Sequence, residues 1–308
     1  MVSNVDMSVD LAGIKLKNPI NTASGTYGYG WQFESFYDVS QLGAITTKGC
    51  AAEAWPGNPA PRMTEVTSGM MNSVGLQNPG VRGLIEGSGE YLQELSDKGT
   101  AVICQVAGHS VEEYVAAVEL FEELAPFAAG LEINISCPNI AAGGCAMGST
   151  PEGAAGVIRA VRPHTKKPLL VKMAPARVVD VAKALEAEGA DALTVINSIP
   201  GMAIDVNTRR SKLSRPTGGM SGPALHPIAV RMVWEVHNAV NLPIVGVGGV
   251  MTGADAAEFI LAGATSVSVG MANLVDPMAA PRILGELTEW AESQGVSSIS
   301  ELIGAFEG

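Results

Sequence analysis

The chain has 308 residues, 47% of them hydrophobic and 16% charged, a composition that supports a large buried core and excludes a disordered protein. Its 31 acidic residues outnumber its 19 basic residues, and the formal net charge of −12 argues against nucleic acid or an anionic membrane as the main partner. Because the four cysteines show neither disulfide-framework nor metal-ligand spacing, and the first residues lack the pattern of a signal peptide, we expect a cytoplasmic protein without a metal site.

Short β-branched runs alternate with longer segments of helical periodicity along the chain. Eight of the short runs are apolar throughout, as strands buried on both faces of a parallel sheet are. In chain order they cover residues 20–23, 44–47, 101–106, 131–134, 169–173, 192–196, 243–247 and 266–269. Eight predicted strands that alternate with helices indicate an α/β fold. We expect a TIM (β/α)8 barrel that spans residues 1–308 as one domain.

Several of the intervening segments carry signals for helix ends. Ser110 and Glu113 have the spacing of a capping box at the start of an amphipathic segment. Gly189 stands where a helix would end in a left-handed residue. A further helix is expected within residues 252–263, with Phe259 facing inward.

Two longer segments, residues 50–80 and 198–223, fit neither a strand nor a helix pattern. Each follows a predicted strand, so each begins at the carboxyl end of the barrel. Loops of this length in a compact domain usually cover or bind a ligand. We therefore expect two long irregular loops at the opening of the barrel.

Polar residues and glycines follow the predicted strands, where the active sites of parallel barrels are built. By strand they are Ser24 and Gly25, Lys48 and Gly49, Asn134 and Cys137, Lys172, Asn197 and Ser198, Gly248 and Gly249, and Gly270. All should face one opening. The glycines after the last two strands expose backbone amides where barrels commonly hold a phosphate, which implies a phosphorylated ligand; the alternative is that they only permit tight turns.

Two lysines and one cysteine are the reactive candidates. Lys48 and Lys172 follow apolar strand residues, and a buried ammonium group is costly without a partner, so we expect an anionic or strongly polar ligand beside them. Cys137 lies between Asn134 and Pro138 in the sequence NISCPN. An unperturbed thiol is only about 3% ionised at pH 7, so a general base at this position would need cationic neighbours, which the lysines provide in part.

The other cysteines, Cys50, Cys104 and Cys145, are expected to be small buried residues. Four asparagines can each donate and accept a hydrogen bond, which suits a ring with alternating N–H and C=O groups, although asparagine is also an ordinary turn former. They are Asn72, Asn134, Asn139 and Asn197. No histidine directly follows a predicted strand, which argues against a Ser/His hydrolase.

Several segments together resemble one enzyme family over nearly the whole chain. They are residues 57–62 (GNPAPR), 72–80 (NSVGLQNPG), 134–139 (NISCPN), 195–205 (VINSIPGMAID) and 218–223 (GGMSGP). This set is similar to the dihydroorotate dehydrogenases, flavin enzymes of pyrimidine biosynthesis built on a TIM barrel. The last two segments most resemble the NAD-linked type 1B catalytic subunit. The membrane-bound class resembles the chain less, because it carries Ser at the position of Cys137 and has an amino-terminal membrane helix.

The resemblance implies roles for individual residues. FMN would be bound by Ser24, Lys48, Gly49, Asn134, Lys172, Ile196, Gly222, Gly248, Gly249, Gly270 and Met271. Dihydroorotate would contact Lys48, Asn72, Ser73, Val74, Gly75, Leu76, Asn134, Asn139, Asn197 and Ser198. It further implies that Cys137 takes a proton from C5 while C6 passes a hydride to the flavin, and that Lys172 stabilises the reduced flavin. Electrons would leave through a partner subunit with FAD and a 2Fe-2S cluster, in a heterotetramer.

Three positions depart from the family pattern, and three alternatives to the leading function stay open. Gln105 stands where Asn is common, Met271 where Thr is usual, and Met147 where Phe is expected. The alternatives are a fumarate-linked homodimeric relative, a flavin reductase of another pyrimidine, and a barrel that binds a phosphorylated ligand without catalysis.

Overall fold

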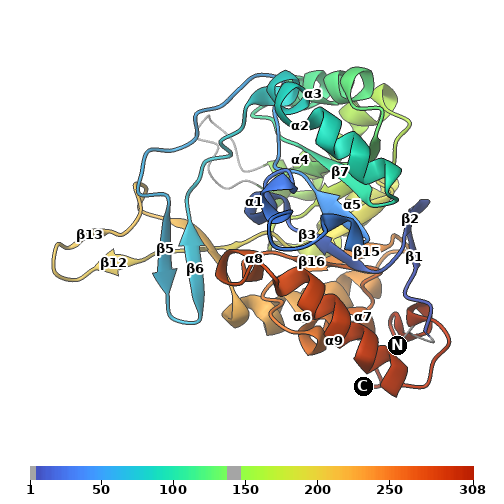
Figure 1. The fold of residues 1–308 in the computed structure, drawn as a ribbon. Coiled ribbons are helices and arrows are strands. Elements are labelled where there is room, and N and C mark those ends of the chain that lie inside the picture. The colour runs from blue at the N-terminus through green and yellow to red at the C-terminus, as the bar shows by residue number, and fades with distance from the viewer. Residues whose placement is uncertain (1–4, 137–146) are drawn as a thin grey trace.

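Eight parallel strands form a nearly closed barrel in the computed structural model, which describes residues 5–136 and 147–308 (Figure 1). In the order of the sheet they are β3 (Ile20–Thr22), β16 (Ser266–Val269), β15 (Ile244–Val247), β10 (Ala192–Val195), β9 (Leu169–Lys172), β8 (Ala128–Asn134), β7 (Ala101–Val106) and β4 (Ala44–Thr46). The two end strands approach each other, since the Gly43 N–H donates to the Ile20 carbonyl at 3.0 Å. The predicted TIM-barrel fold is confirmed, and all eight predicted strands are present.

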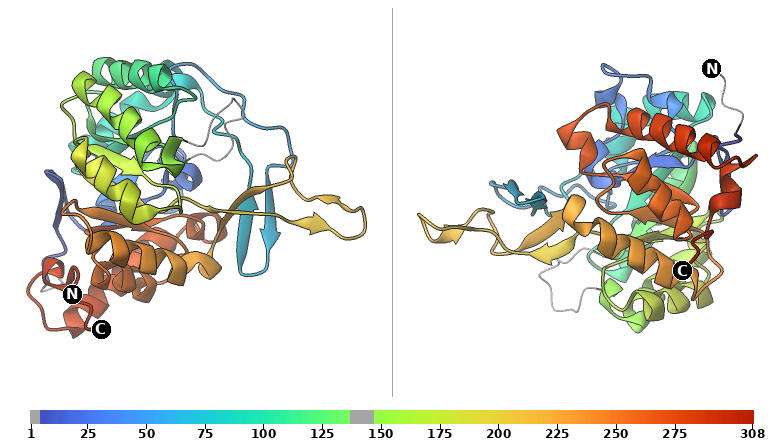
Figure 2. Two further views of the ribbon diagram at one scale, coloured as in Figure 1. Left: turned by 180° about the vertical axis from the view of Figure 1, so that it is seen from behind. Right: turned by 90° about the horizontal axis from the view of Figure 1, so that it is seen from below.

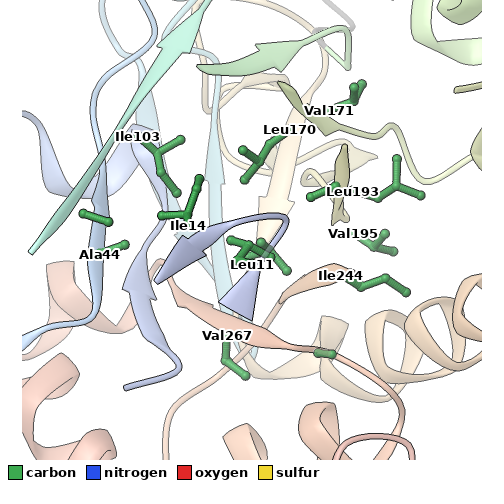
Figure 3. Close-up of a cluster of buried hydrophobic side chains, with 14 of the residues drawn as sticks. Leu11, Ile14, Ala44, Ile103, Leu170, Val171, Leu193, Val195, Ile244 and Val267 are labelled. Atoms are coloured by element: carbon green, nitrogen blue, oxygen red, sulfur yellow. The ribbon is translucent and has the colours of Figure 1, made fainter. Parts of the chain in front are cut away.

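The apolar runs form strands because both faces of the sheet are buried. Every residue of β7, β9, β10, β15 and β16 is buried. A hairpin of β1 (Val9–Leu11) and β2 (Ile14–Leu16) places Leu11 and Ile14 among the side chains of the barrel strands (Figure 3). Ile14 comes close to Gly130 near the start of β8, so the hairpin covers the amino-terminal end of the barrel.

The longer helices pack around the outside of the barrel (Figure 2). They are α2 (Gly80–Asp97), α3 (Val111–Leu124), α4 (Pro151–Val161), α5 (Val178–Ala187), α6 (His226–His237), α7 (Gly253–Leu261) and α9 (Ala279–Ser293). Two single-turn helices, α1 (Ser24–Tyr27) and α8 (Ala272–Val275), lie at the carboxyl ends of β3 and β16. Among the described residues, we find no helix with the length and apolar character needed to cross a membrane.

The helix-end predictions are confirmed with one correction. Gly189 follows α5 with φ of +86°, and Phe259 is buried in α7. The Ser110 hydroxyl accepts from the Glu113 N–H at 3.3 Å, as predicted. The Glu113 carboxylate, however, accepts from the N–H of His109 at 2.7 Å, one residue before the one that a capping box requires.

The prediction that residues 50–80 and 198–223 are irregular was wrong. They contain β5 (Met63–Val66), β6 (Gly69–Asn72), β11 (Ile199–Gly201) and β14 (Gly218–Ser221), which pair in an antiparallel sheet of order β11-β14-β6-β5. We call this the accessory sheet. Next to it, β12 (Ile204–Asp205) and β13 (Arg210–Ser211) form a hairpin that projects from the barrel (Figure 1). These strands were missed because they are short, and because the pairing of β6 with β14 joins two segments that are distant in the sequence.

Candidate active site

A hollow with about 1340 Å³ of space, its open mouth included, lies at the carboxyl ends of the barrel strands. Both the barrel and the accessory sheet contribute to its lining. The residues predicted to bind a cofactor or substrate that line it are Ser24, Lys48, Asn72, Val74, Gly75, Leu76, Asn134, Lys172, Ile196, Asn197, Ser198, Gly222, Gly248, Gly249, Gly270 and Met271. The structure therefore brings together residues that are up to about 250 positions apart in the chain.

Four predicted site residues are not among those that line the hollow. Gly49 lies against the side chain of Gln105, where an added Cβ would come within 2.5 Å of the amide oxygen. Ser73 is fully buried, and its hydroxyl accepts from the Asn58 side chain at 3.0 Å. Cys137 and Asn139 lie outside the described residues.

The charge of the lining is positive although the chain is acidic. Lys48 and Lys172 are the charged residues in the described lining, which contains no carboxylate. Lys172 is only 7% exposed, and no hydrogen bond or ion pair of its ammonium group is found among the described residues. A buried cation without a protein partner is costly, so this geometry favours an anionic or strongly polar ligand beside Lys172.

Glycines form a close-packed wall of the same hollow. Gly249 has φ of +67°, and an added Cβ would lie 2.7 Å from the Gly222 carbonyl. Behind the turn, His226 Nδ1 lies 3.1 Å from the Gly248 carbonyl oxygen, and since a carbonyl only accepts, Nδ1 carries the proton. His226 Nε2 faces α7, where it lies 3.3 Å from Glu258 and 3.8 Å from Asp255.

Asn197 is held in the hollow by hydrogen bonds. Its Nδ2 donates to the Ser136 hydroxyl at 2.8 Å, and its Oδ1 accepts from the Ser198 N–H at 2.8 Å. Asn72 reaches the hollow from β6, where its Nδ2 donates to the Gly219 carbonyl at 3.4 Å. Asn72 thus comes from the accessory sheet, and Asn197 from the loop that follows barrel strand β10.

Cys50 and Cys104 are buried free thiols beneath the site, as predicted; Cys145 lies outside the described residues. Burial raises the pKa of Cys50 to about 11 and that of Cys104 to about 12. At neutral pH both thiols are therefore un-ionised and poor nucleophiles.

Sequence reasoning did not assign some residues that line the hollow. Those from the accessory sheet or its vicinity are Met63, Met70, Gly219, Ser221 and Leu225, and those near the barrel include Thr26, Val247 and Leu274. The accessory-sheet residues carry no local signal, because their position depends on the pairing of β6 with β14. A polar or glycine residue directly after a strand was the useful signal, and these residues lack it.

Residues 6–290 match the family model described as dihydroorotate dehydrogenase. The chain belongs to the dihydroorotate dehydrogenase family. It is 47% identical over 304 residues to the Geobacter metallireducens protein named dihydroorotate dehydrogenase B (NAD(+)), catalytic subunit, with 98% of each chain covered. A protein of the same name from Lachnoclostridium phytofermentans is 47% identical over 302 residues, which is 97% of this chain and 99% of that protein.

A solved dihydroorotate dehydrogenase has the same fold. The crystal structure of DHODH from Eimeria tenella in complex with ferulenol matches 97% of this chain and 88% of its own, with a TM-score of 0.80 and 21% identity. This likeness supports the barrel architecture. The family model and the relatives, rather than this structure, confirm the family resemblance predicted from the sequence motifs.

The three departures from the family pattern can now be located in the structure. Gln105 lines the hollow and is hydrogen-bonded to Asn134 and Glu132. Met271 lines the hollow near Gly222, with its sulfur 3.0 Å from the position of a Cβ there. Met147 is half-buried and packs against the core.

Proposed function

We propose that the chain is the catalytic subunit of an NAD-linked dihydroorotate dehydrogenase, which oxidises dihydroorotate to orotate in pyrimidine biosynthesis with FMN as its cofactor. The observation that carries the proposal is the cationic, amide-rich hollow in an acidic chain. A phosphorylated flavin and a substrate with a carboxylate and ring amides are the ligands that this chemistry favours. Membership of the family supports the same reaction.

The described residues fit FMN in two respects. Lys172 has a buried ammonium group without a protein partner among the described residues, suited to a polar edge of the flavin. At Gly249 a Cβ would meet the Gly222 carbonyl and His226, so only glycine fits this turn, and the bare backbone N–H groups of such a turn suit a phosphate group. The residues that would hold FMN are Ser24, Lys48, Gly49, Asn134, Lys172, Ile196, Gly222, Gly248, Gly249, Gly270 and Met271. FMN, when bound, supplies the hydride acceptor for C6 of dihydroorotate.

The substrate would be held by amides and one lysine. The contacts are Lys48, Asn72, Ser73, Val74, Gly75, Leu76, Asn134, Asn139, Asn197 and Ser198. Cys137, as a thiolate, would take the proton from C5, so that loss of this proton and of the C6 hydride leaves the C5–C6 double bond of orotate. Lys48 and Lys172 favour negative charge nearby, which helps the thiol ionise and stabilises electron density delivered to the cofactor.

The electrons require an exit from this subunit. The Geobacter and Lachnoclostridium relatives are named catalytic subunits that are linked to NAD(+). We therefore propose a partner subunit that carries FAD and a 2Fe-2S cluster and passes electrons to NAD, within a heterotetramer in the cytoplasm.

An anaerobic absorbance spectrum tests cofactor and substrate together. The purified chain should be yellow, dihydroorotate should bleach the flavin band, and dihydrouracil should not. Bleaching by dihydrouracil alone would instead identify a reductase of another pyrimidine, and a colourless protein would favour a barrel that only binds a phosphorylated ligand. Rapid turnover of the isolated chain with fumarate would favour the homodimeric alternative to the NAD-linked enzyme.

Replacement of the proposed base gives a second test. Cys137→Ser should retain the flavin but slow its reduction at neutral pH by orders of magnitude, because a hydroxyl ionises far less readily than a thiol. Stopped-flow absorbance measures the rate. Cys104→Ser is a control for loss of a thiol elsewhere, and an undiminished rate in Cys137→Ser would remove Cys137 from this role.

A further inference from the structure

The first turn of α6 packs directly behind the glycine turn formed by Gly248 and Gly249. An added Cβ at Gly248 would lie 2.7 Å from the Ala229 Cβ, and one at Gly249 would lie 2.9 Å from the backbone nitrogen and from the Cβ of His226. His226 is 8% exposed and is not among the residues that line the hollow, whereas both glycines are. His226 therefore contacts the glycine turn from the side away from the hollow.

One nitrogen of the His226 ring holds the Gly248 carbonyl, and the other forms no comparable hydrogen bond. Nδ1 donates to the Gly248 carbonyl oxygen at 3.1 Å, and we find no other hydrogen bond to this oxygen among the described residues. Nε2 faces Glu258 and Asp255 on α7, but without the geometry of a hydrogen bond to any described residue. The ring of Phe259 packs edge to face against the imidazole, with centroids 5.1 Å apart, and fixes its plane.

The orientation of the Gly248 carbonyl determines where the next N–H group points. The peptide bond between Gly248 and Gly249 is trans, so its C=O and N–H groups lie in one plane and point in opposite directions. Because the carbonyl is turned toward His226, away from the hollow, the Gly249 N–H is turned toward the hollow. We find no hydrogen bond from this N–H within the described part of the chain, which leaves it available to a ligand.

We propose that His226 is a positioning residue for the phosphate group of the cofactor. Its Nδ1 holds the peptide between Gly248 and Gly249 in the orientation that presents the Gly249 N–H to the phosphate. Both glycines have positive φ, +147° and +67°, and glycine is conformationally permissive. The turn by itself therefore does little to fix this peptide plane, and a hydrogen bond from outside the turn has a large effect on it. The inference rests on the proposed function, because it takes FMN as the ligand.

Two substitutions distinguish the two nitrogens of the ring. In His226→Asn the side-chain Nδ2 can take the place of histidine Nδ1, so the bond to Gly248 is kept and FMN should bind within about threefold of wild type. In His226→Gln the longer side chain carries its NH2 group to the place of Nε2, so the bond is lost and FMN should bind about tenfold more weakly. Glu258→Gln is the control for the contact with α7 and should leave FMN affinity within about twofold of wild type, because exposed ion pairs contribute little.

Riboflavin, which lacks the phosphate, is the matched ligand. The full chain is freed of flavin and titrated with FMN or with riboflavin; quenching of flavin fluorescence gives each dissociation constant, and the thermal midpoint checks folding. Weaker binding of FMN but not of riboflavin in His226→Gln, with FMN affinity kept in His226→Asn, supports the proposal. Equal losses for both ligands, equal losses in both variants, or wild-type FMN affinity in a folded His226→Gln would overturn it, since a merely structural role predicts the first two.

Amide hydrogen exchange decides the matter even if His226→Gln does not fold. In the wild-type chain and in His226→Asn, FMN should slow the exchange of the Gly249 N–H, whereas riboflavin should not. Equal exchange with both ligands would show that this N–H does not meet the phosphate and would overturn the proposal. A wild-type chain that binds neither FMN nor riboflavin would instead contradict the proposed function.

Discussion

The barrel and the accessory sheet line the same hollow but are held together in different ways. All six residues of β7 are buried, whereas β5 alternates between exposed and half-buried positions. The barrel strands follow one another around the ring in chain order. In the accessory sheet, by contrast, β6 pairs with β14, which brings Asn72 opposite Gly219, 147 residues later in the chain. The barrel is thus stabilised by core burial, and the accessory sheet by backbone pairing between two distant segments.

The difference implies that the two regions bind different ligands in the proposed enzyme. The barrel supplies the glycine turn and the buried Lys172 that would hold FMN, and the accessory sheet brings Asn72 and the segment that follows it over the substrate side. Changes in the barrel should therefore affect flavin content and stability together. Changes in the accessory sheet should affect substrate affinity while the flavin is retained.

The largest effect is expected from Gly249→Ala in the barrel. A left-handed alanine costs about 1–3 kcal/mol, and its Cβ would lie 2.7 Å from the Gly222 carbonyl. Flavin content, measured as the ratio of flavin to protein absorbance, should fall severely along with the thermal midpoint. Gly87→Ala in α2, where an added Cβ meets nothing within 4 Å, should retain flavin and gain about 0.5–1 kcal/mol. Full flavin content in Gly249→Ala would place the phosphate elsewhere.

Alkaline pH should destabilise the barrel because two of its cysteine thiols are buried. Thiols in the unfolded chain ionise near pH 9, whereas burial raises the pKa of Cys50 to about 11 and that of Cys104 to about 12. Above pH 9 the unfolded state therefore binds fewer protons, and stability falls with rising pH by up to about 1.4 kcal/mol per thiol per pH unit. Denaturant unfolding between pH 8 and 10.5 measures the slope. Cys50→Ala and Cys104→Ala should each reduce it, and unchanged slopes in both would contradict this origin.

Gly218→Ala should separate the accessory sheet from the barrel. A Cβ at this position would lie 2.5 Å from the Asn72 carbonyl, so β14 must move away from β6. Orotate should bind about tenfold more weakly, the equivalent of about 1.4 kcal/mol, with flavin content unchanged. Gly201→Ala in β11 is the matched control, because its Cβ would lie 3.4 Å from the end of Met71 and 3.7 Å from Met220 Cβ, which are ordinary van der Waals distances. Loss of flavin in Gly218→Ala would show that the two regions are not separable.

The smallest effect concerns a helix on the outside of the barrel. The Thr252 hydroxyl accepts from the Asp255 N–H at 3.2 Å and begins α7 with a full capping box. Thr252→Ala should cost about 1 kcal/mol in denaturant unfolding and leave orotate affinity unchanged. Thr208→Ala in the exposed β12–β13 hairpin should change stability by less than about 0.5 kcal/mol. A change in orotate affinity in Thr252→Ala would contradict the separation of α7 from the site.

The barrel could be predicted from the sequence because each strand is buried on both faces, and this leaves a local apolar run. The same logic located the polar residues that follow the strands, such as Lys172 and Asn197, at one opening. It did not find β5, β6, β11 and β14, since these strands are short and exposed in part, and only the pairing of β6 with β14 joins the two distant segments. Gln105 could be identified as a departure from the family pattern, but its link to Glu132 could not.

What the sequence determined by itself is the parallel barrel, the opening at its carboxyl end and the family to which the chain belongs, because these depend on local periodicity and on short contiguous motifs. Only the tertiary structure decided that two long segments pair over the opening, and that Gln105 connects the buried Glu132 to Asn134 by hydrogen bonds. Both features arise from contacts between residues far apart in the chain, and such contacts leave no periodic trace in either segment alone.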